Sequence, residues 1–293
     1  MTLPHTIIAI LINLLWGSMF VAAAIGLREF PPILFTGIRF GLLAILLFAF
    51  IRVPKNQMLP LFKIGLVMGA GMYLTLYLSV ALAENTASIA VFSKLEVPFA
   101  LLLGVVLLGE RIGIRRIAGV SIAMIGAIII TFDPAAFDDL PALFWMAVSC
   151  AFSAFGFIQV RQLGKIHPFT IVAWISVVSA PILLTTSFIF ESDQVQVVQS
   201  ASLTGWLALA YTAIMSSVVA NSGLYFLLQR YPVSQVTPFG LLSPIFAVIG
   251  GLLFLDDVLT VGLIFGGSLI LFGVTWINRR NASLESRAAK QQA

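Results

Sequence analysis

Long apolar stretches recur along the whole chain, and short segments with proline, glycine and charged residues separate them. A helix needs about 20 such residues to cross the hydrocarbon core of a bilayer. The pattern therefore predicts an all-α transmembrane fold with short connections and no inserted soluble domain. Ten helices are expected, at residues 6–26, 33–51, 60–82, 86–108, 113–132, 140–160, 169–190, 203–228, 233–254 and 259–277.

The composition agrees with this pattern, because 60% of the residues are hydrophobic and only 10% are charged. Soluble domains do not have such a composition. The formal net charge of +4 comes from basic residues in short loops and near the C-terminus, which argues against nucleic-acid binding. The single cysteine, Cys150, excludes an internal disulfide and fits no metal cluster, so no metal or other cofactor is expected.

Basic residues are distributed unevenly over the predicted loops. Thirteen of the sixteen Lys and Arg residues fall after the second, fourth, sixth and eighth spans or in the tail. The exceptions are Arg28, Arg39 and Lys94. Because cytoplasmic loops carry the excess of Lys and Arg, both termini are expected in the cytoplasm of a bacterium, with the chain in its cytoplasmic (inner) membrane.

The two halves of the sequence are related. At a spacing of 146 residues, Pro98 matches Pro244. Each half holds five spans, and an odd number means that the two copies cross the membrane in opposite directions. We expect two inverted five-helix repeats, at residues 1–137 and 138–278, followed by a disordered cytoplasmic tail at 279–293.

The segment 93–110 combines three features that are costly inside a membrane. Lys94 and Glu96 are charged, and a charge at the bilayer centre costs about 2.5–3.5 kcal/mol. Proline removes a helical hydrogen bond, so Pro98 and its match Pro244 predict kinks in the fourth and ninth spans. Such groups persist only beside protein or a wet cavity, so the fourth span is expected to line a solute path.

The two charged residues of this segment need separate partners. Lys94 and Glu96 are two positions apart, about 200° around a helix. Arg39 and Glu96 lie at similar depths, about 10 and about 12 Å from the same side, which predicts an ion pair between them. This pair is either a structural lock or part of a proton-coupled cycle in which Glu96 titrates. Lys94 is then free to hold a substrate carboxylate, unless it also only locks helices together.

Aromatic and amide side chains repeat at helical spacing in the first, third and eighth spans. Aromatic walls with a few amide groups suit a zwitterion or another polar metabolite, and the alternative is that these stripes only pack helices. The predicted substrate-binding residues are Asn13, Trp16, Tyr73, Tyr77, Lys94, Asn221 and Tyr225.

Several short motifs follow one another in a fixed order. They are Trp16-Gly17, Pro31-Pro32 followed by Arg39, Pro98 with Gly109-Glu110-Arg111, and the second-half run RYPVSQVTPFGLLSPIFAVIGGLLFLDD. This duplicated order resembles the EamA family of the drug/metabolite transporter superfamily over about residues 6–277. The resemblance implies two inverted five-helix halves and transport of small metabolites, often export of amino acids or their derivatives. Lys94, Glu96 and the pair Asp256-Asp257 depart from the family pattern.

The leading hypothesis is a secondary transporter in the lipid bilayer that exports a small-molecule solute by alternating access. A permease that works as an exchanger or importer is the main alternative. The chain has no Walker A loop, so ATP does not drive it directly. An intramembrane enzyme is a weaker alternative, because no HExxH or GxSxG motif is present. A membrane sensor would need a signalling domain that the sequence lacks, and nothing in the sequence predicts the oligomeric state.

Overall fold

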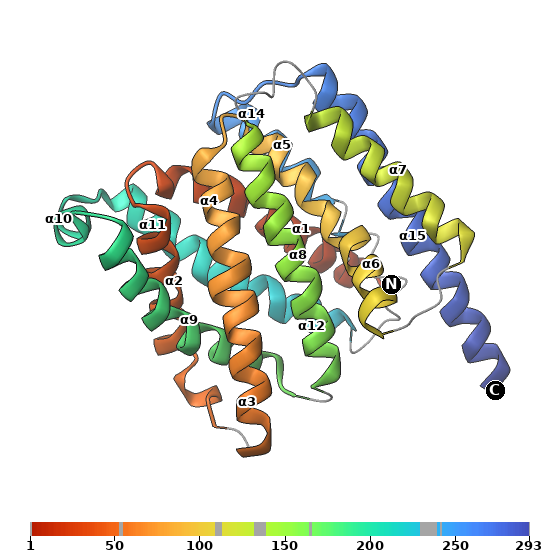
Figure 1. Cartoon of the computed structure of the whole chain (residues 1–293), viewed down its shortest axis with the longest axis horizontal. Coiled ribbons are helices and arrows are strands. Elements are labelled where there is room, and N and C mark those ends of the chain that lie inside the picture. Colours follow the sequence, from red (N-terminus) through yellow and green to blue (C-terminus); the bar gives the residue numbers. More distant parts are fainter. Residues whose placement is uncertain are drawn as a thin grey trace.

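The computed structural model of the chain is built from helices, and its described part contains no β-strand (Figure 1). Described are residues 2–52, 55–108, 113–131, 139–163, 166–228, 239–240 and 242–292. The first-half helices are α1 (Leu3–Leu27), α2 (Pro32–Leu46), η1 (Phe48–Phe50), α3 (Lys55–Ile64), η2 (Gly65–Tyr73), α4 (Leu74–Leu82), α5 (Thr86–Phe92), η3 (Ser93–Leu95), α6 (Glu96–Leu108) and α7 (Ile114–Thr131). The second-half helices are α8 (Leu140–Gln162), α9 (Pro168–Phe190), α10 (Gln194–Ser200), α11 (Leu203–Tyr211), η5 (Thr212–Ala220), α12 (Asn221–Leu228), α14 (Leu242–Phe254) and α15 (Val261–Gln292).

Six helices of this part of the chain are long and apolar enough to cross a membrane, and shorter apolar helices accompany them. The six are Leu3–Leu27, Asn56–Leu82, Thr86–Leu107, Leu140–Val160, Pro168–Phe190 and Leu203–Ala220, and the shorter ones are Pro32–Leu46, Ile117–Ile130, Leu242–Phe254 and Val261–Trp276. Large apolar side chains such as Val106 and Phe254 cover the outside, as a bilayer requires. The chain is therefore an all-helical, multi-pass membrane protein, whereas the count of ten spans and their inversion stay predictions.

Two sequence predictions concern the C-terminal half of the chain. The first part of the predicted span 233–254 lies outside the described residues, and α14 covers the rest. In the structure α15 continues as a helix to Gln292. The predicted disorder of the tail at 279–293 stays a prediction.

Helix packing follows a paired pattern that supports the duplication. α1 packs against α14 as α8 packs against α6, and α1 packs against η5 as α8 packs against η2. The two largest contacts join counterparts, since α7 packs on α15 and α2 on α9. Figure 1 shows α7 and α15 side by side at one edge of the bundle.

Irregular segments also occur in pairs. η2 and η5 are π-helical, each has nine residues, and they begin 147 positions apart, at Gly65 and Thr212. α6 begins at Glu96 and α14 at Leu242, in each case two residues before a proline. Proline is tolerated in the first turn of a helix because its missing N–H has no helical acceptor there. The 3₁₀ segment η3 thus ends where the kink beside Pro98 is predicted.

Glycines allow α7 and α15 to approach at backbone distance. A Cβ atom on Gly126 would lie 2.4 Å from the carbonyl oxygen of Gly266, and one on Gly273 would lie 2.6 Å from that of Gly119. Any larger residue would push the helices apart. Small residues serve the same purpose in other membrane helix pairs.

Candidate functional site

Arg39 lies in the middle of α2 and is fully buried, with 0% of its surface exposed. Its Cζ atom is 4.4 Å from the ring centre of Tyr73, 5.1 Å from that of Phe40 and 5.6 Å from that of Tyr77. Aromatic rings attract a cation through their negative faces. We call Arg39 and these three rings the Arg39 cage.

The hydrogen bonds of Arg39 connect the two halves of the chain. Its Nη2 atom donates to the carbonyl oxygen of Thr212 at 3.3 Å and to Oγ of Ser217, both in η5. π-Helical segments inside longer helices are frequent at functional sites. The Nε and Nη1 atoms have no hydrogen-bond partner among the described residues. Since buried polar groups are usually paired, the cage presents N–H donors that are still available.

The predicted ion pair between Arg39 and Glu96 is not formed. Glu96 instead accepts a hydrogen bond from Oγ of Ser153 on α8, at 3.1 Å. The prediction compared only the depths of the two residues, and equal depth does not make two helices neighbours. α2 packs against α9 and η5, whereas α6 packs against α8, and this arrangement keeps the two side chains apart.

Lys94 and Glu96 belong to a second polar group, at the junction of η3 and α6. Both side chains are half-buried. The thiol of Cys150 on α8 donates to the carbonyl oxygen of Ser93 at 3.4 Å, which ties the irregular segment to the second half. The ammonium group of Lys94 has no hydrogen bond or ion pair to another described residue, so it remains a candidate solute contact.

The predicted contacts on the first and eighth spans form a third group. Asn13 is buried, its Nδ2 atom donates to the carbonyl oxygen of Ala9 at 2.8 Å, and its Oδ1 atom has no described partner. Trp16 packs against a small apolar cluster that includes Ile12 and Leu227. Asn221 begins α12, which contacts α1. The side chain of Tyr225 lies outside the described residues.

The structure thus brings together only some of the predicted site residues. Tyr73 and Tyr77 lie on one face, with ring centres 6.3 Å apart, and both face Arg39. Sequence reasoning missed Thr212 as a partner, because its carbonyl oxygen carries no residue-specific signal. Helical spacing already aligns Ser217 with Asn221 and Tyr225, since it lies one turn before Asn221 in the same span.

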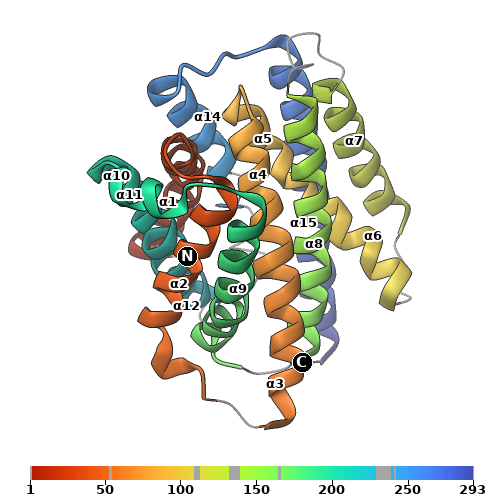
Figure 2. The ribbon, with the colours of Figure 1, turned by 60° about the vertical axis from the view of Figure 1, so that its left-hand side comes forward.

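Carboxylates outside the spans join the two halves at one end of the molecule. Asp257, between α14 and α15, accepts hydrogen bonds from the backbone N–H groups of Thr86 and Ala87, at 3.2 and 2.8 Å. Asp139, before α8, accepts from the N–H groups of Glu84 and Asn85, at 2.6 and 3.4 Å. Figure 2 shows the α4–α5 turn and the α14–α15 link at the same end.

Two further carboxylates make equivalent contacts. Glu191, after α9, accepts from the N–H groups of Ile33 and Leu34, each at 2.8 Å. Glu29, after α1, accepts from the N–H and the Oγ–H of Ser202, each at 2.6 Å. The free N–H groups and positive dipole end of a helix favour a carboxylate. We call Glu29, Asp139, Glu191 and Asp257 the carboxylate links.

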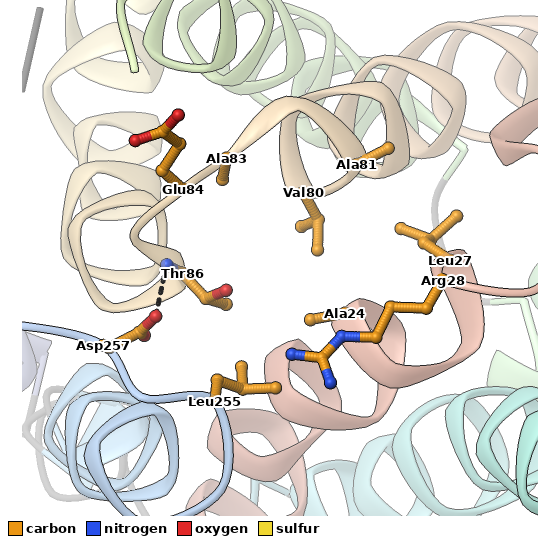
Figure 3. A pocket seen from close by; sticks show the side chains of 10 residues that line it. All are labelled: Ala24, Leu27, Arg28, Val80, Ala81, Ala83, Glu84, Thr86, Leu255 and Asp257. Carbon is orange, nitrogen blue, oxygen red and sulfur yellow. Dashed lines mark hydrogen bonds between the residues drawn. The ribbon is translucent and has the colours of Figure 1, made fainter. Parts of the chain in front are cut away.

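A cavity of about 130 Å³ opens beside these links (Figure 3). Its walls come from the end of α1, the α4–α5 turn and the residues after α14. Figure 3 shows the Arg28 side chain extending toward Leu255, the Asp257 carboxylate at the N–H of Thr86, and Glu84 pointing away from Arg28. The cavity has room for a few water molecules or a very small solute.

Burial affects these carboxylates differently. Desolvation raises the pKa of Asp257 and of Asp139 above the usual range, and the N–H groups that they accept from oppose this rise. The charges of Glu84 and Asp257 raise the pKa of Asp139 further. The hydrogen bonds from Ser202 lower the pKa of Glu29 instead. A rise in pH therefore weakens the stabilisation at Asp257 and Asp139, whereas the stabilisation at Glu29 is lost when pH falls.

These features define a multi-pass helical membrane protein with two related halves, joined at one end by carboxylates and in the interior by a buried arginine. The model of the EamA-like transporter family matches residues 4–132 and again residues 140–279. The chain therefore belongs to the EamA-like transporter family, and the resemblance noted in the sequence is confirmed.

Named relatives agree with this family. The chain is 26% identical over 280 residues to a "Probable amino-acid metabolite efflux pump" of Escherichia coli (strain K12), covering 93% of each chain. It is 24% identical to an "Uncharacterized transporter" of Archaeoglobus fulgidus, covering 90% of this chain and 95% of the other. It is 25% identical to the "Uncharacterized inner membrane transporter YedA" of E. coli (strain K12), covering 81% and 78%.

A solved crystal structure shares the fold. The two chains superpose with a TM-score of 0.62 at 19% sequence identity, and the match covers 99% of each. At this identity the likeness concerns the fold alone.

Proposed function

We propose that the protein is a secondary transporter that exports small metabolites such as amino acids or their derivatives. It works by alternating access between two inverted five-helix repeats in the bacterial inner membrane, with both termini in the cytoplasm. The substrate class rests on the relative from E. coli that is 26% identical to this chain and is named a probable amino-acid metabolite efflux pump. The orientation rests on the distribution of basic residues.

The observation that carries this proposal is the set of carboxylate links between the halves. Each one joins a carboxylate of one half to backbone N–H groups of the other, as in the contact of Asp257 with Thr86. Charge-assisted hydrogen bonds of this kind are strong but local, so a small separation of the two halves breaks them. They suit a gate that closes one end and reopens during each cycle.

The solute path runs, in this proposal, between the halves past the matched irregular helices. Tyr73 of η2 and both Thr212 and Ser217 of η5 lie around Arg39. Pro98 and Pro244 have no N–H, so each removes the helical hydrogen bond to the carbonyl four residues earlier, that of Lys94 or of Gly240. Transporters of other folds place solutes at such interrupted helices near the midplane. Asn13, Trp16 and Asn221 remain proposed contacts on the adjoining wall.

Glu96 is the proposed group for proton coupling. It is half-buried beside the break in the fourth span and accepts one neutral hydrogen bond, from Ser153. A carboxylate without a described cation can take up and release a proton as its surroundings change. Proton antiport then supplies the energy for export, and exchange without protons is the alternative.

Counterflow in reconstituted vesicles tests the proposal. Vesicles loaded with one unlabelled amino acid at a time are mixed with the same amino acid in radiolabelled form, with and without a pH gradient. Saturable uptake for a subset of the panel, absent from empty vesicles, is the expected result. Uptake equal to that of empty vesicles for every amino acid and derivative would remove this substrate class.

A further inference from the structure

The strongest unexplained feature of the molecule is the buried cation of the Arg39 cage. The guanidinium is fully buried, and its Nε and Nη1 atoms have no hydrogen-bond partner among the described residues. The neighbouring rings attract the cation through their faces, and their polar atoms are the neutral hydroxyls of Tyr73 and Tyr77, so the cage supplies no anion. A desolvated charge of this kind normally has an anionic partner.

We infer that Arg39 is the binding site for the carboxylate group of the transported solute. This inference rests on the proposed function and names the chemical group that the central site recognises. The carboxylate accepts from the N–H groups of Nε and Nη1, while Nη2 keeps its contacts with Thr212 and Ser217. A guanidinium suits this role, since its planar array of donors matches a carboxylate.

The charge of the site favours a carboxylate over a phosphate. Arg39 is the one cation of the cage, and a carboxylate carries a single negative charge. A phosphate group carries about −1.5 to −2 at pH 7 and would keep an unbalanced charge in this apolar position. Once the cage opens, its aromatic rings suit an apolar side chain next to the carboxylate, as in an amino acid or an organic acid.

The position of the site fits a solute that moves between the halves. Arg39 belongs to α2 in the first half, and both of its hydrogen-bond acceptors belong to η5 in the second. In the present conformation the guanidinium is out of reach of solvent. Separation of α2 from η5 opens the cage, and the bound carboxylate then replaces contacts that the cation loses.

Binding of benzoate and of its uncharged isostere benzamide to the purified full-length protein tests this inference. We expect benzoate to bind the wild type and benzamide to bind at least tenfold more weakly. Arg39→Gln should weaken benzoate at least tenfold, and Arg39→Lys, which keeps the charge, should weaken it less. Arg52→Gln makes the same change at an exposed arginine and should leave the dissociation constant for benzoate unchanged.

Several results would overturn the inference. They are equal binding of benzoate and benzamide, no benzoate binding to the wild type, tighter binding of inorganic phosphate than of benzoate, or loss of benzoate binding in Lys94→Met but not in Arg39→Gln. If Arg39→Gln does not fold, Arg39→Lys and the comparison of the two probes decide. If amino-acid counterflow fails but benzoate binding is intact and depends on Arg39, the proposed function alone is refuted. If counterflow is observed but benzoate binding does not depend on Arg39, the inference alone is refuted.

Discussion

At the scale of single residues, the Arg39 cage explains how a charge is tolerated inside the bundle without a carboxylate partner. An arginine at this depth costs about 2.5–3.5 kcal/mol on insertion scales. The cation–π interaction with each ring face contributes about 0.5–2 kcal/mol, depending on how far the pair is desolvated. Hydrogen bonds from a charged group to Thr212 and Ser217 add about 1.5–3 kcal/mol each. These contributions offset the cost of the charge while the cage is closed, and the unpaired Nε and Nη1 donors still favour an anion.

A residue-scale prediction concerns Glu96. Glu96→Gln removes the proton-binding group but keeps a side chain that can contact Ser153. If Glu96 couples transport to protons, counterflow in the variant should persist at a rate within about threefold of wild type. A pH gradient should then no longer increase its net export.

The control for this experiment is Asp193→Asn, which neutralises an exposed carboxylate at the start of α10. Its positive φ of 61° is tolerated by asparagine. This variant should respond to the pH gradient as the wild type does. An unchanged response in Glu96→Gln would assign proton coupling to another group or exclude it.

Helical spacing predicted part of the site, and tertiary contacts decided the rest. Tyr73 and Tyr77 were expected on one face because they are four residues apart, and both face Arg39. The partner of Arg39 was predicted wrongly, because depth along a helix says nothing about the direction in which a side chain points. Neighbours across the bundle follow from packing, which no single span encodes.

At the scale of elements, the lengths of the apolar runs predicted the positions of the helices well. The π-helical segments within them were not predicted. The sequence places α1 and α9 within a few residues of their observed bounds, because each is one apolar run between polar segments. The π segments η2 and η5 have no sequence signal comparable to a proline. Only their equal length and their spacing of 147 residues connect them to the duplication.

An element-scale prediction concerns the contact of α7 with α15. Gly126→Ala places a Cβ atom 2.4 Å from the backbone oxygen of Gly266, which cannot move like a side chain. Overpacking of this kind typically costs about 1–3 kcal/mol, so the midpoint of thermal unfolding in detergent should fall by several degrees.

Gly41→Ala is the matched control, because nothing lies within 4 Å of a Cβ atom at that position of α2. Alanine is the better helix former by about 1 kcal/mol, so this variant should be as stable as the wild type or slightly more stable. Equal behaviour of the two variants would contradict the close packing of α7 and α15.

At the scale of the whole molecule, the carboxylate links make one end of the bundle sensitive to pH. Burial raises the pKa of Asp257, so the folded protein binds its proton more tightly than the unfolded chain does. The resulting stabilisation is fully present below the usual carboxyl pKa of about 3.9 and is lost as pH rises through the raised value. Arg28 and Glu84 line the same cavity, and Asp139 lies close enough for its pKa to respond to the charge of Asp257.

Thermal unfolding at several pH values tests this dependence. As pH rises above about 4, the midpoint of the wild type should fall relative to that of Asp257→Asn, since the variant has no charge to bury. The exposed variant Asp193→Asn should show no comparable trend. A difference that is constant with pH, or that shifts toward the wild type, would contradict a raised pKa at Asp257.

The central claim is that the two halves must separate at the carboxylate links during transport. Asn85 and Val258 are adjacent across this end, since Nδ2 of Asn85 donates to the carbonyl oxygen of Val258 at 2.6 Å. Cysteines at both positions, with Cys150→Ser to remove the native thiol, allow this end to be locked by oxidation and released by reduction. The single-cysteine variants, treated in the same way, are the controls.

The decisive measurement is amino-acid counterflow in vesicles that contain the double-cysteine protein, before oxidation, after it and after reduction. The account predicts that oxidation abolishes counterflow and that reduction restores it, while the single-cysteine variants are unaffected. Full counterflow with the cross-link in place would contradict the account.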